Sequence, residues 1–172
     1  MFYFLTKKEN MIKIAVSACL LGHNVRYDGQ NKQSTILNHF DSRKYQLVAL
    51  CPEVEMGLAV PRPPIQIRNN KTIQLVQVQQ PQLDYTSQMQ HWFERNIAVF
   101  NSYHGFVLKS KSPSCGNQTT PHYFNDGTST LSDGLFVHLL KQHKPMVPLL
   151  DEQSMTNPIT LKRFKQALLT SL

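Results

Sequence analysis

The segment IKIAVSACLLG, residues 12–22, is the strongest indication of the fold in this sequence. Four of its first five residues are apolar, and three of these are β-branched; Lys13 is the exception. This pattern predicts a short buried strand over 12–16. The chain then reaches Cys19 within three residues. The same order, a buried strand followed closely by a cysteine, occurs again at Cys51 and Cys115. These strand ends are therefore the first place to look for a functional site.

Further strands and helices alternate along the rest of the chain. The apolar patterns predict strands over 46–50, 72–78, 105–108 and 145–150. They predict helices over 31–40, 85–103 and 131–143, and one that Asn157 and Pro158 begin. The stretches 54–71 and 117–131 are expected to be loops, the first because it is rich in Pro and Gly. This alternation predicts an α/β fold with a mostly parallel sheet flanked by helices.

The three cysteines are expected to share one site. They lie 32 and 64 residues apart, yet each follows a predicted strand: Cys19, Cys51 and Cys115. In a parallel sheet the carboxyl ends of the strands meet at one edge, where ligands bind. Cysteine is otherwise most often a buried apolar residue. The Ser, Pro, Glu and Gly neighbours of these three favour a shared site over simple burial.

Three thiolates at one site can have three kinds of role. They can bind one zinc ion with a fourth position open, or a [4Fe–4S] cluster that keeps one iron free of protein ligands. Alternatively, one thiolate can act as a nucleophile. No CxxC pair is present, which excludes a zinc finger and a thioredoxin-like motif. An odd number of cysteines also argues against a disulfide framework.

Polar residues beside the cysteines extend the candidate site. Glu53 can carry protons, although it can equally be a carboxylate paired to Arg62. Lys109 would stabilise thiolates or an anionic substrate. Asp28 is either a site residue or a turn residue. The segment KSKSPSCG, residues 109–116, offers three hydroxyls, of which at least two are expected to serve only the turn.

Composition sets limits on the class of protein. The 172 residues fit one domain, and 41% hydrophobic with 17% charged residues is usual for a soluble globular protein. No apolar run approaches the ~20 residues of a membrane span, so we expect no membrane partner. The net charge of +7 is spread along the chain, which favours a generally basic surface over a nucleic-acid stripe. We expect a cytoplasmic protein.

The chain is expected to hold a single α/β domain over residues 11–172. Residues 1–10 are expected to be an N-terminal extension, and the start at Met1 or Met11 stays open. This segment does not have the order of a secretory signal, because its charges follow its apolar part.

Five ordered motifs resemble those of the thiouracil desulfidase family. They are VSACLLG at 16–22, VRYDG at 25–29, CPEV at 51–54, PRPP at 61–64 and KSPSCG at 111–116. The resemblance implies a Rossmann-like fold and an oxygen-sensitive [4Fe–4S] cluster on Cys19, Cys51 and Cys115. It also implies conversion of 2-thiouracil to uracil and hydrogen sulfide without net redox change, with the sulfur taken by the free iron.

The same resemblance implies roles for individual residues. Glu53 and Ser112 correspond to the acidic residue and the serine of catalysis, and Ser17, Asp28 and Lys109 are expected to bind the substrate. The expected partners are a small thiolated base and the iron–sulfur assembly machinery. Gln30, Met56-Gly57 and Gln66 depart from the family pattern, which bears on the shape of the substrate pocket.

Two other functions stay open. The same thiolates would serve a protein that binds or delivers a metal or a cluster without catalysis. The positive charge would suit a role on thiolated RNA, although the absence of a basic stripe argues against it.

Overall fold

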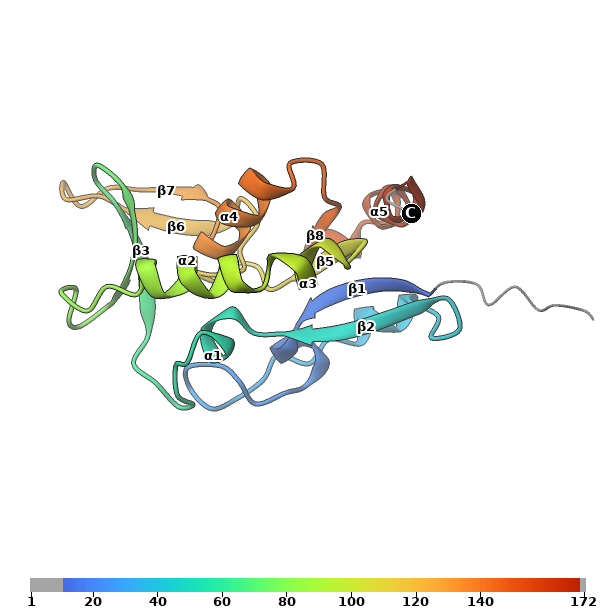
Figure 1. Ribbon diagram of the computed structural model, residues 1–172, viewed down its shortest axis with the longest axis horizontal. Coiled ribbons are helices and arrows are strands. Elements are labelled where there is room, and N and C mark those ends of the chain that lie inside the picture. Colours follow the sequence, from blue (N-terminus) through green and yellow to red (C-terminus); the bar gives the residue numbers. More distant parts are fainter. Residues whose placement is uncertain (1–10, 171–172) are drawn as a thin grey trace, which may run out of the picture.

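Four parallel strands form the central sheet of the computed structural model, which describes residues 11–170. Their order is β2-β1-β5-β8 (Figure 1). The strands are β1 (Ile12–Ser17), β2 (Tyr45–Leu50), β5 (Gly105–Leu108) and β8 (Leu149–Asp151). Every pair in this sheet is parallel, with Val16 beside Ala49 on one side and Val107 on the other. The predicted parallel sheet is thus confirmed, and its order reverses at β1.

A second four-stranded sheet, which the sequence did not predict, has the order β4-β3-β6-β7. Its strands are β3 (Ile65–Asn69), β4 (Ile73–Gln77), β6 (Thr120–Tyr123) and β7 (Ser129–Ser132). β3 and β6 pair in parallel, and the two outer pairs are antiparallel. Only β4 was expected as a strand. The other three lie in stretches predicted as loops, because they are short and gain their stability from pairing with each other rather than from local pattern.

Helices cover the parallel sheet on both faces. The α-helices are α1 (Pro52–Glu55), α2 (Thr86–Arg95), α3 (Ile97–Asn101), α4 (Leu135–His143) and α5 (Pro158–Thr170). Three short 3₁₀ turns complete the elements: η1 (Ala18–Leu21), η2 (Thr35–His39) and η3 (Ser154–Thr156). The predicted helix over 85–103 is interrupted at Asn96, and the one over 31–40 is only the η2 turn. The helix predicted from 131 begins at Leu135, since 129–132 pair as β7.

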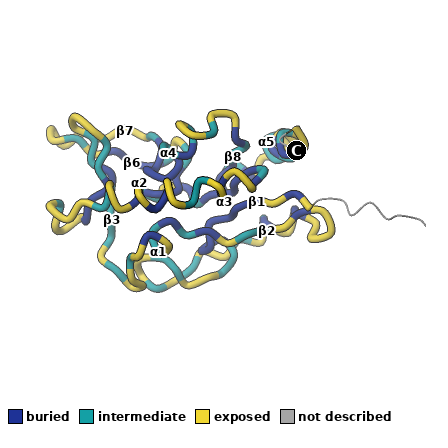
Figure 2. Tube along the Cα trace, viewed as in Figure 1, coloured by how far each residue is buried: buried dark blue, intermediate teal, exposed yellow. Residues whose placement is uncertain are grey.

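The side chains of β1 alternate between two hydrophobic cores, as the period of a strand requires. Ile14 and Val16 face a core with Phe164 and Leu168 of α5. Ala15 faces the other core, which contains the aromatic residues of α2, α3 and α4 and two residues of the second sheet. Figure 2 shows β1 buried between these layers. The second core therefore joins the two sheets next to the carboxyl ends of the parallel strands.

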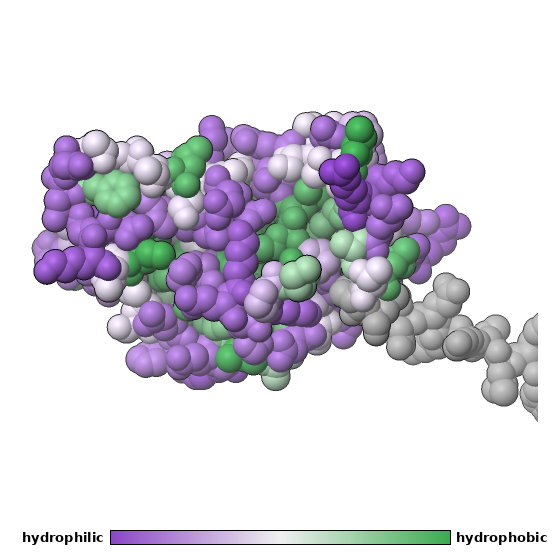
Figure 3. Space-filling model, turned by 90° about the horizontal axis from the view of Figure 1, so that it is seen from above, coloured by the Kyte–Doolittle hydropathy of each residue, from purple (hydrophilic) through white to green (hydrophobic). Residues whose placement is uncertain are grey.

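The face of the molecule seen in Figure 3 is largely hydrophilic, with separate hydrophobic patches. Within residues 11–170, no helix is both long and apolar enough to cross a membrane. The predicted extension, residues 1–10, lies outside the described residues.

Candidate active site

A cavity of about 420 Å³ opens at the carboxyl edge of the parallel sheet. It lies where the strand order reverses, the usual ligand position in open α/β sheets. Seven of the eight predicted site residues line it: Ser17, Cys19, Cys51, Glu53, Lys109, Ser112 and Cys115. Asp28, the eighth, lies outside the lining. The residues that follow the strands β1, β2 and β5 thus line one cavity.

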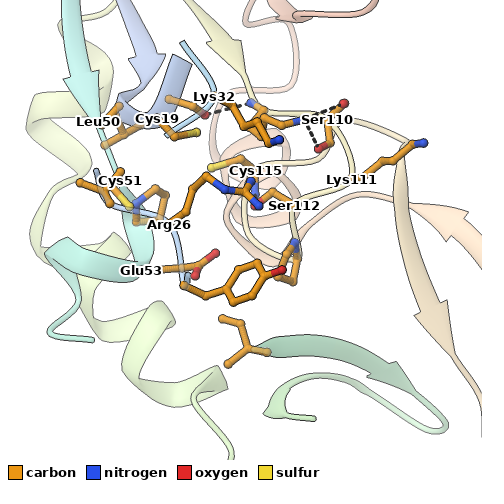
Figure 4. Close-up of a pocket in the computed structure, with 18 of the residues that line it drawn as sticks. Cys19, Arg26, Lys32, Leu50, Cys51, Glu53, Ser110, Lys111, Ser112 and Cys115 are labelled. Carbon is orange, nitrogen blue, oxygen red and sulfur yellow. Dashed lines mark hydrogen bonds between the residues drawn. The ribbon is translucent and has the colours of Figure 1, made fainter. Parts of the chain in front are cut away.

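The three cysteines enter the cavity from three separate strands. Cys19 lies in η1 directly after β1, Cys51 precedes α1 directly after β2, and Cys115 lies in the loop after β5. All three are free thiols, and Figure 4 shows them around the upper part of the pocket. Segments far apart in sequence therefore bring their sulfur atoms to one cavity.

Burial makes each of these thiols hard to ionise. It raises the pKa of Cys51 to about 11, and it raises the pKa of Cys19 and of Cys115. For Cys115, a hydrogen bond from Ser17 opposes this effect, whereas negative charge on Cys51 and Cys19 adds to it. Without a metal the thiols stay protonated at neutral pH, and a bound metal would displace these protons.

The spacing of the thiols bears on which metal group they suit. Within residues 11–170, no three His, Cys, Asp or Glu side chains are grouped tightly enough to bind a single metal ion. A [4Fe–4S] cluster takes each thiolate on a different iron, so three thiols spread around one cavity suit it.

Glu53 is fixed in the cavity wall by two partners. Its Oε2 accepts hydrogen bonds from Arg62 Nη2 at 2.7 Å and Nε at 3.1 Å. The side chains of Arg62 and Glu53 are only 6% and 12% exposed, so the expected ion pair is present and buried. The Oγ of Ser114 donates to Glu53 Oε1 at 2.9 Å. The Glu53 carboxylate is therefore paired with the Arg62 cation, and the hydrogen bonds from Arg62 and Ser114 hold it in one orientation.

The three serines of the 109–116 loop have different positions. Ser110 Oγ donates to Glu152 at 2.7 Å, and Ser114 is fully buried behind the cavity lining. Ser112 alone of the three both lines the cavity next to Cys115 and accepts backbone hydrogen bonds, from the N–H of Ser114 at 3.3 Å and of Cys115 at 3.0 Å. Its own O–H proton is still available to donate.

Helix α4 secures this loop from behind. Two carbonyl groups of the loop accept hydrogen bonds from the start of the helix. The N–H of Leu135 donates to the carbonyl of Pro113 at 2.9 Å, and the N–H of Gly134, the N-cap residue, donates to the carbonyl of Gly116 at 2.8 Å. The free N–H groups at a helix start need such partners. The loop that carries Cys115 is thus part of the packed structure.

Comparison with known proteins agrees with this site. The family model for 2-thiouracil desulfurase matches residues 14–152, which include all three cysteines. The chain belongs to the 2-thiouracil desulfurase family. This confirms the family indicated by the five sequence motifs.

Two similar proteins accompany this family match. The solved structure of TudS, described as a [4Fe–4S]-dependent thiouracil desulfidase, is 32% identical and superposes with a TM-score of 0.69. That likeness covers 92% of this chain and 99% of TudS. YbbK of Bacillus subtilis (strain 168), described as uncharacterized, is 28% identical over 138 residues, covering 75% of this chain and 89% of YbbK.

In this member of the 2-thiouracil desulfurase family, Lys109 is held by a residue that the sequence analysis missed. Its Nζ pairs with Glu152, and its backbone N–H donates to Ser17 Oγ at 2.9 Å. The backbone N–H of Ser110 also donates to Glu152, at 2.8 Å. Glu152 directly follows β8, so the argument from strand ends that selected the cysteines would also have found it.

Arg26 is the second residue that the sequence analysis missed. It lines the cavity, and in Figure 4 its guanidinium extends towards Cys115 and Ser112. Asp28 lies behind it, with Oδ1 3.4 Å from Arg26 Nε. Asp28 thus contacts a lining residue of this family member, and direct binding of substrate by Asp28 stays a prediction. Arg26 lies within the VRYDG motif, but the motif does not distinguish it from Asp28 as the residue that lines the cavity.

Proposed function

We propose that this chain removes sulfur from a thiolated pyrimidine, converting 2-thiouracil and water to uracil and hydrogen sulfide. The carbon that loses sulfur gains oxygen from water, so the reaction needs no oxidant or reductant. We further propose that Cys19, Cys51 and Cys115 hold a [4Fe–4S] cluster, because the similar protein TudS is [4Fe–4S]-dependent. The observation that carries the proposal is the convergence of three free cysteines from separate strands on one cavity.

When bound, the cluster would supply Lewis-acid chemistry to a thiocarbonyl sulfur through an iron free of protein ligands. The fit rests on the donor set, since soft thiolates suit iron–sulfur groups. Burial raises the pKa of all three thiols, and binding of the cluster would favour their thiolate forms by releasing the protons. The iron–sulfur assembly machinery is the expected source of the cluster.

Glu53 is the proposed proton carrier. Arg62 holds Oε2, so Oε1 is the oxygen better placed to accept a proton from the attacking water. Its hydrogen bond from Ser114 keeps that oxygen in one orientation. A carboxylate that turned freely would lose part of the benefit of positioning.

Ser112 is the proposed hydroxyl that contacts the substrate or the attacking water. It lines the cavity beside Cys115, while two backbone N–H groups direct its oxygen. Ser17 and Lys109 are proposed to complete the wall of the substrate pocket from the ends of β1 and β5. Because Glu152 pairs with Lys109, that lysine contributes shape and hydrogen bonding more than net charge.

The proposal is tested by anaerobic reconstitution. Iron and sulfide are counted per chain, and hydrogen sulfide release from 2-thiouracil is then measured. We expect a coloured protein with one cluster per chain and catalytic release of sulfide. Cys51→Ala should lose both. A protein that stays free of iron would contradict the cluster, and a loaded protein inactive on all thiolated bases would indicate a binding or delivery role.

A further inference from the structure

Arg26 carries a buried donor, Nε, that makes no hydrogen bond, although the Asp28 carboxylate lies beside it as an ion-pair partner with Oδ1 at 3.4 Å. Across the part of the chain that the structure describes, Arg26 Nε is the one buried side-chain nitrogen or oxygen without a hydrogen-bond partner. A buried N–H without an acceptor costs free energy, and such groups are rare in folded proteins. Because the side chain lines the cavity, the missing acceptor is expected to come from a ligand.

The backbone and the carboxylate around Arg26 fix this donor in place. The N–H of Arg26 donates to the carbonyl of Gln30 at 3.2 Å, and its own carbonyl accepts from Gly29 at 3.0 Å. The Asp28 carboxylate lies against the guanidinium, with Oδ2 3.4 Å from Nη2 and Oδ1 3.4 Å from Nε, and Asp28 is not a lining residue. The guanidinium carbon also lies 5.4 Å from the centre of the Tyr27 ring. The side chain is therefore held before any ligand arrives.

The other buried cations of the cavity are already committed. Arg62 donates to Glu53 and to the carbonyls of Val25 and Ala59. Lys109 donates to Glu152 and to Ser110. Among the cations of this wall that the structure describes, Arg26 is the one with a buried nitrogen, Nε, that makes no hydrogen bond.

We propose that Arg26 Nε–H donates to a carbonyl oxygen of the substrate and thereby selects bases that carry a carbonyl in addition to the thiocarbonyl. This inference rests on the proposed function. In 2-thiouracil that acceptor is the oxygen on C4. Pyrimidine-2-thione has the same sulfur but lacks this oxygen. A site built to donate a hydrogen bond rejects the analogue that cannot accept it.

The test compares two pairs of ligands on the cluster-loaded protein. Dissociation constants for uracil and for pyrimidin-2-one are measured by calorimetry, and kcat/KM is measured for the two corresponding thiones. The variants are Arg26→Met, which removes the donor, and Arg26→Lys, which keeps the charge. Arg43→Met is the matched control, because the Arg43 side chain is 90% exposed and pairs with Asp41, two residues before it in the sequence.

We expect the wild type to prefer uracil over pyrimidin-2-one, and Arg26→Met to reduce that preference by about ten- to a hundredfold. Arg26→Lys should restore only part of it, and Arg43→Met should match the wild type. If Arg26→Met does not fold or load, the partial loss in Arg26→Lys carries the test. An unchanged preference in both Arg26 variants would overturn the inference.

The same variants also show whether the Arg26 N–H group donates to the cluster and not to the substrate. If Arg26 donated to the cluster instead, Arg26→Met would shift the reduction potential of the cluster and leave the preference intact, which would overturn the inference. A wild type that releases sulfide but binds both products equally would overturn the inference and leave the proposed function standing. A loaded wild type that binds neither product and releases no sulfide would overturn both.

Discussion

Ser114 and Glu53, 61 residues apart in sequence, are joined by a hydrogen bond of 2.9 Å from Ser114 Oγ to Glu53 Oε1. The bond links the loop after β5 to helix α1 after β2, and so it links the segments that carry Cys115 and Cys51. Ser114 itself is fully buried and lies outside the cavity lining. Its hydroxyl therefore positions the carboxylate, whereas Ser112 is the hydroxyl that a substrate can reach.

This division of roles predicts different defects for the two serines. Ser112→Ala removes a hydroxyl from the cavity and should lower kcat by about a hundredfold, within the range of a group that acts on the reacting atoms. Ser114→Ala should lower kcat by about tenfold, because Glu53 remains but loses one partner. Both are measured as sulfide release by protein with matched iron content.

The control for the serine variants is Ser102→Ala. Ser102 Oγ donates to the carbonyl of Val99 at an exposed position before β5, whereas the loop follows β5, and Ser102 does not line the cavity. It should leave kcat and iron content unchanged. Full activity of Ser112→Ala would remove the role proposed for that hydroxyl, and a larger loss in Ser114→Ala than in Ser112→Ala would reverse the assignment.

The buried ion pair between Arg62 and Glu53 predicts a large loss of stability when one partner is removed. Arg62→Ala leaves the Glu53 carboxylate buried without its main partner and should lower the free energy of unfolding by about 3–5 kcal/mol. Arg43→Ala breaks an ion pair that is almost fully exposed and should not change stability measurably. Urea unfolding of the metal-free proteins compares the two, and equal midpoints would contradict this account.

Glu152 predicts a dependence of stability on pH. Burial on its own raises the pKa of this carboxyl, but hydrogen bonds from Lys109 and Ser110 outweigh it and lower the pKa below its usual value. A carboxyl with a lowered pKa in the folded state stabilises the protein above its unfolded pKa, about 4.3. That contribution is lost as the pH falls through the lower folded value.

The corresponding measurement compares the wild type with Glu152→Gln. At pH 7 the variant should be less stable, because glutamine cannot form the ion pair with Lys109. The difference between their urea midpoints should shrink as the pH falls below about 4.3. A difference that stays constant down to pH 3 would show that the ion pair does not contribute through its charge.

The sequence predicted the parallel sheet and the convergence of the three cysteines on one edge of it, because both depend on simple patterns. A buried strand such as 12–16 is a short apolar run, and parallel strands must end at a common edge. Cys19, Cys51 and Cys115 follow three such runs, so their convergence needed no knowledge of distances. For Glu53 the sequence left two roles equally open, a proton carrier or a partner of Arg62, and the structure shows the ion pair with Arg62.

The second sheet was missed for a physical reason. β7 is exposed and lacks an apolar face, and β6 contains Pro121, which a strand pattern does not favour. Both are strands because they pair with each other and because β6 pairs with β3. Arg26 was missed because its importance comes from a buried nitrogen without a partner, which no sequence pattern reveals.

The last prediction concerns Gly134, which lies directly before α4 and packs against the loop that carries Cys115. A Cβ at this position would lie 2.5 Å from the backbone carbon and oxygen of Ser114, so Gly134→Ala must displace the loop that carries Cys115. We expect lower iron content after reconstitution and a larger loss of sulfide release than of stability. Gly127→Ala is the control, because its φ of +84° imposes a cost of about 1 kcal/mol but nothing lies within 4 Å of the added carbon. Equal iron retention by the two variants would mean that the loop tolerates displacement, and that α4 does not hold Cys115 in place.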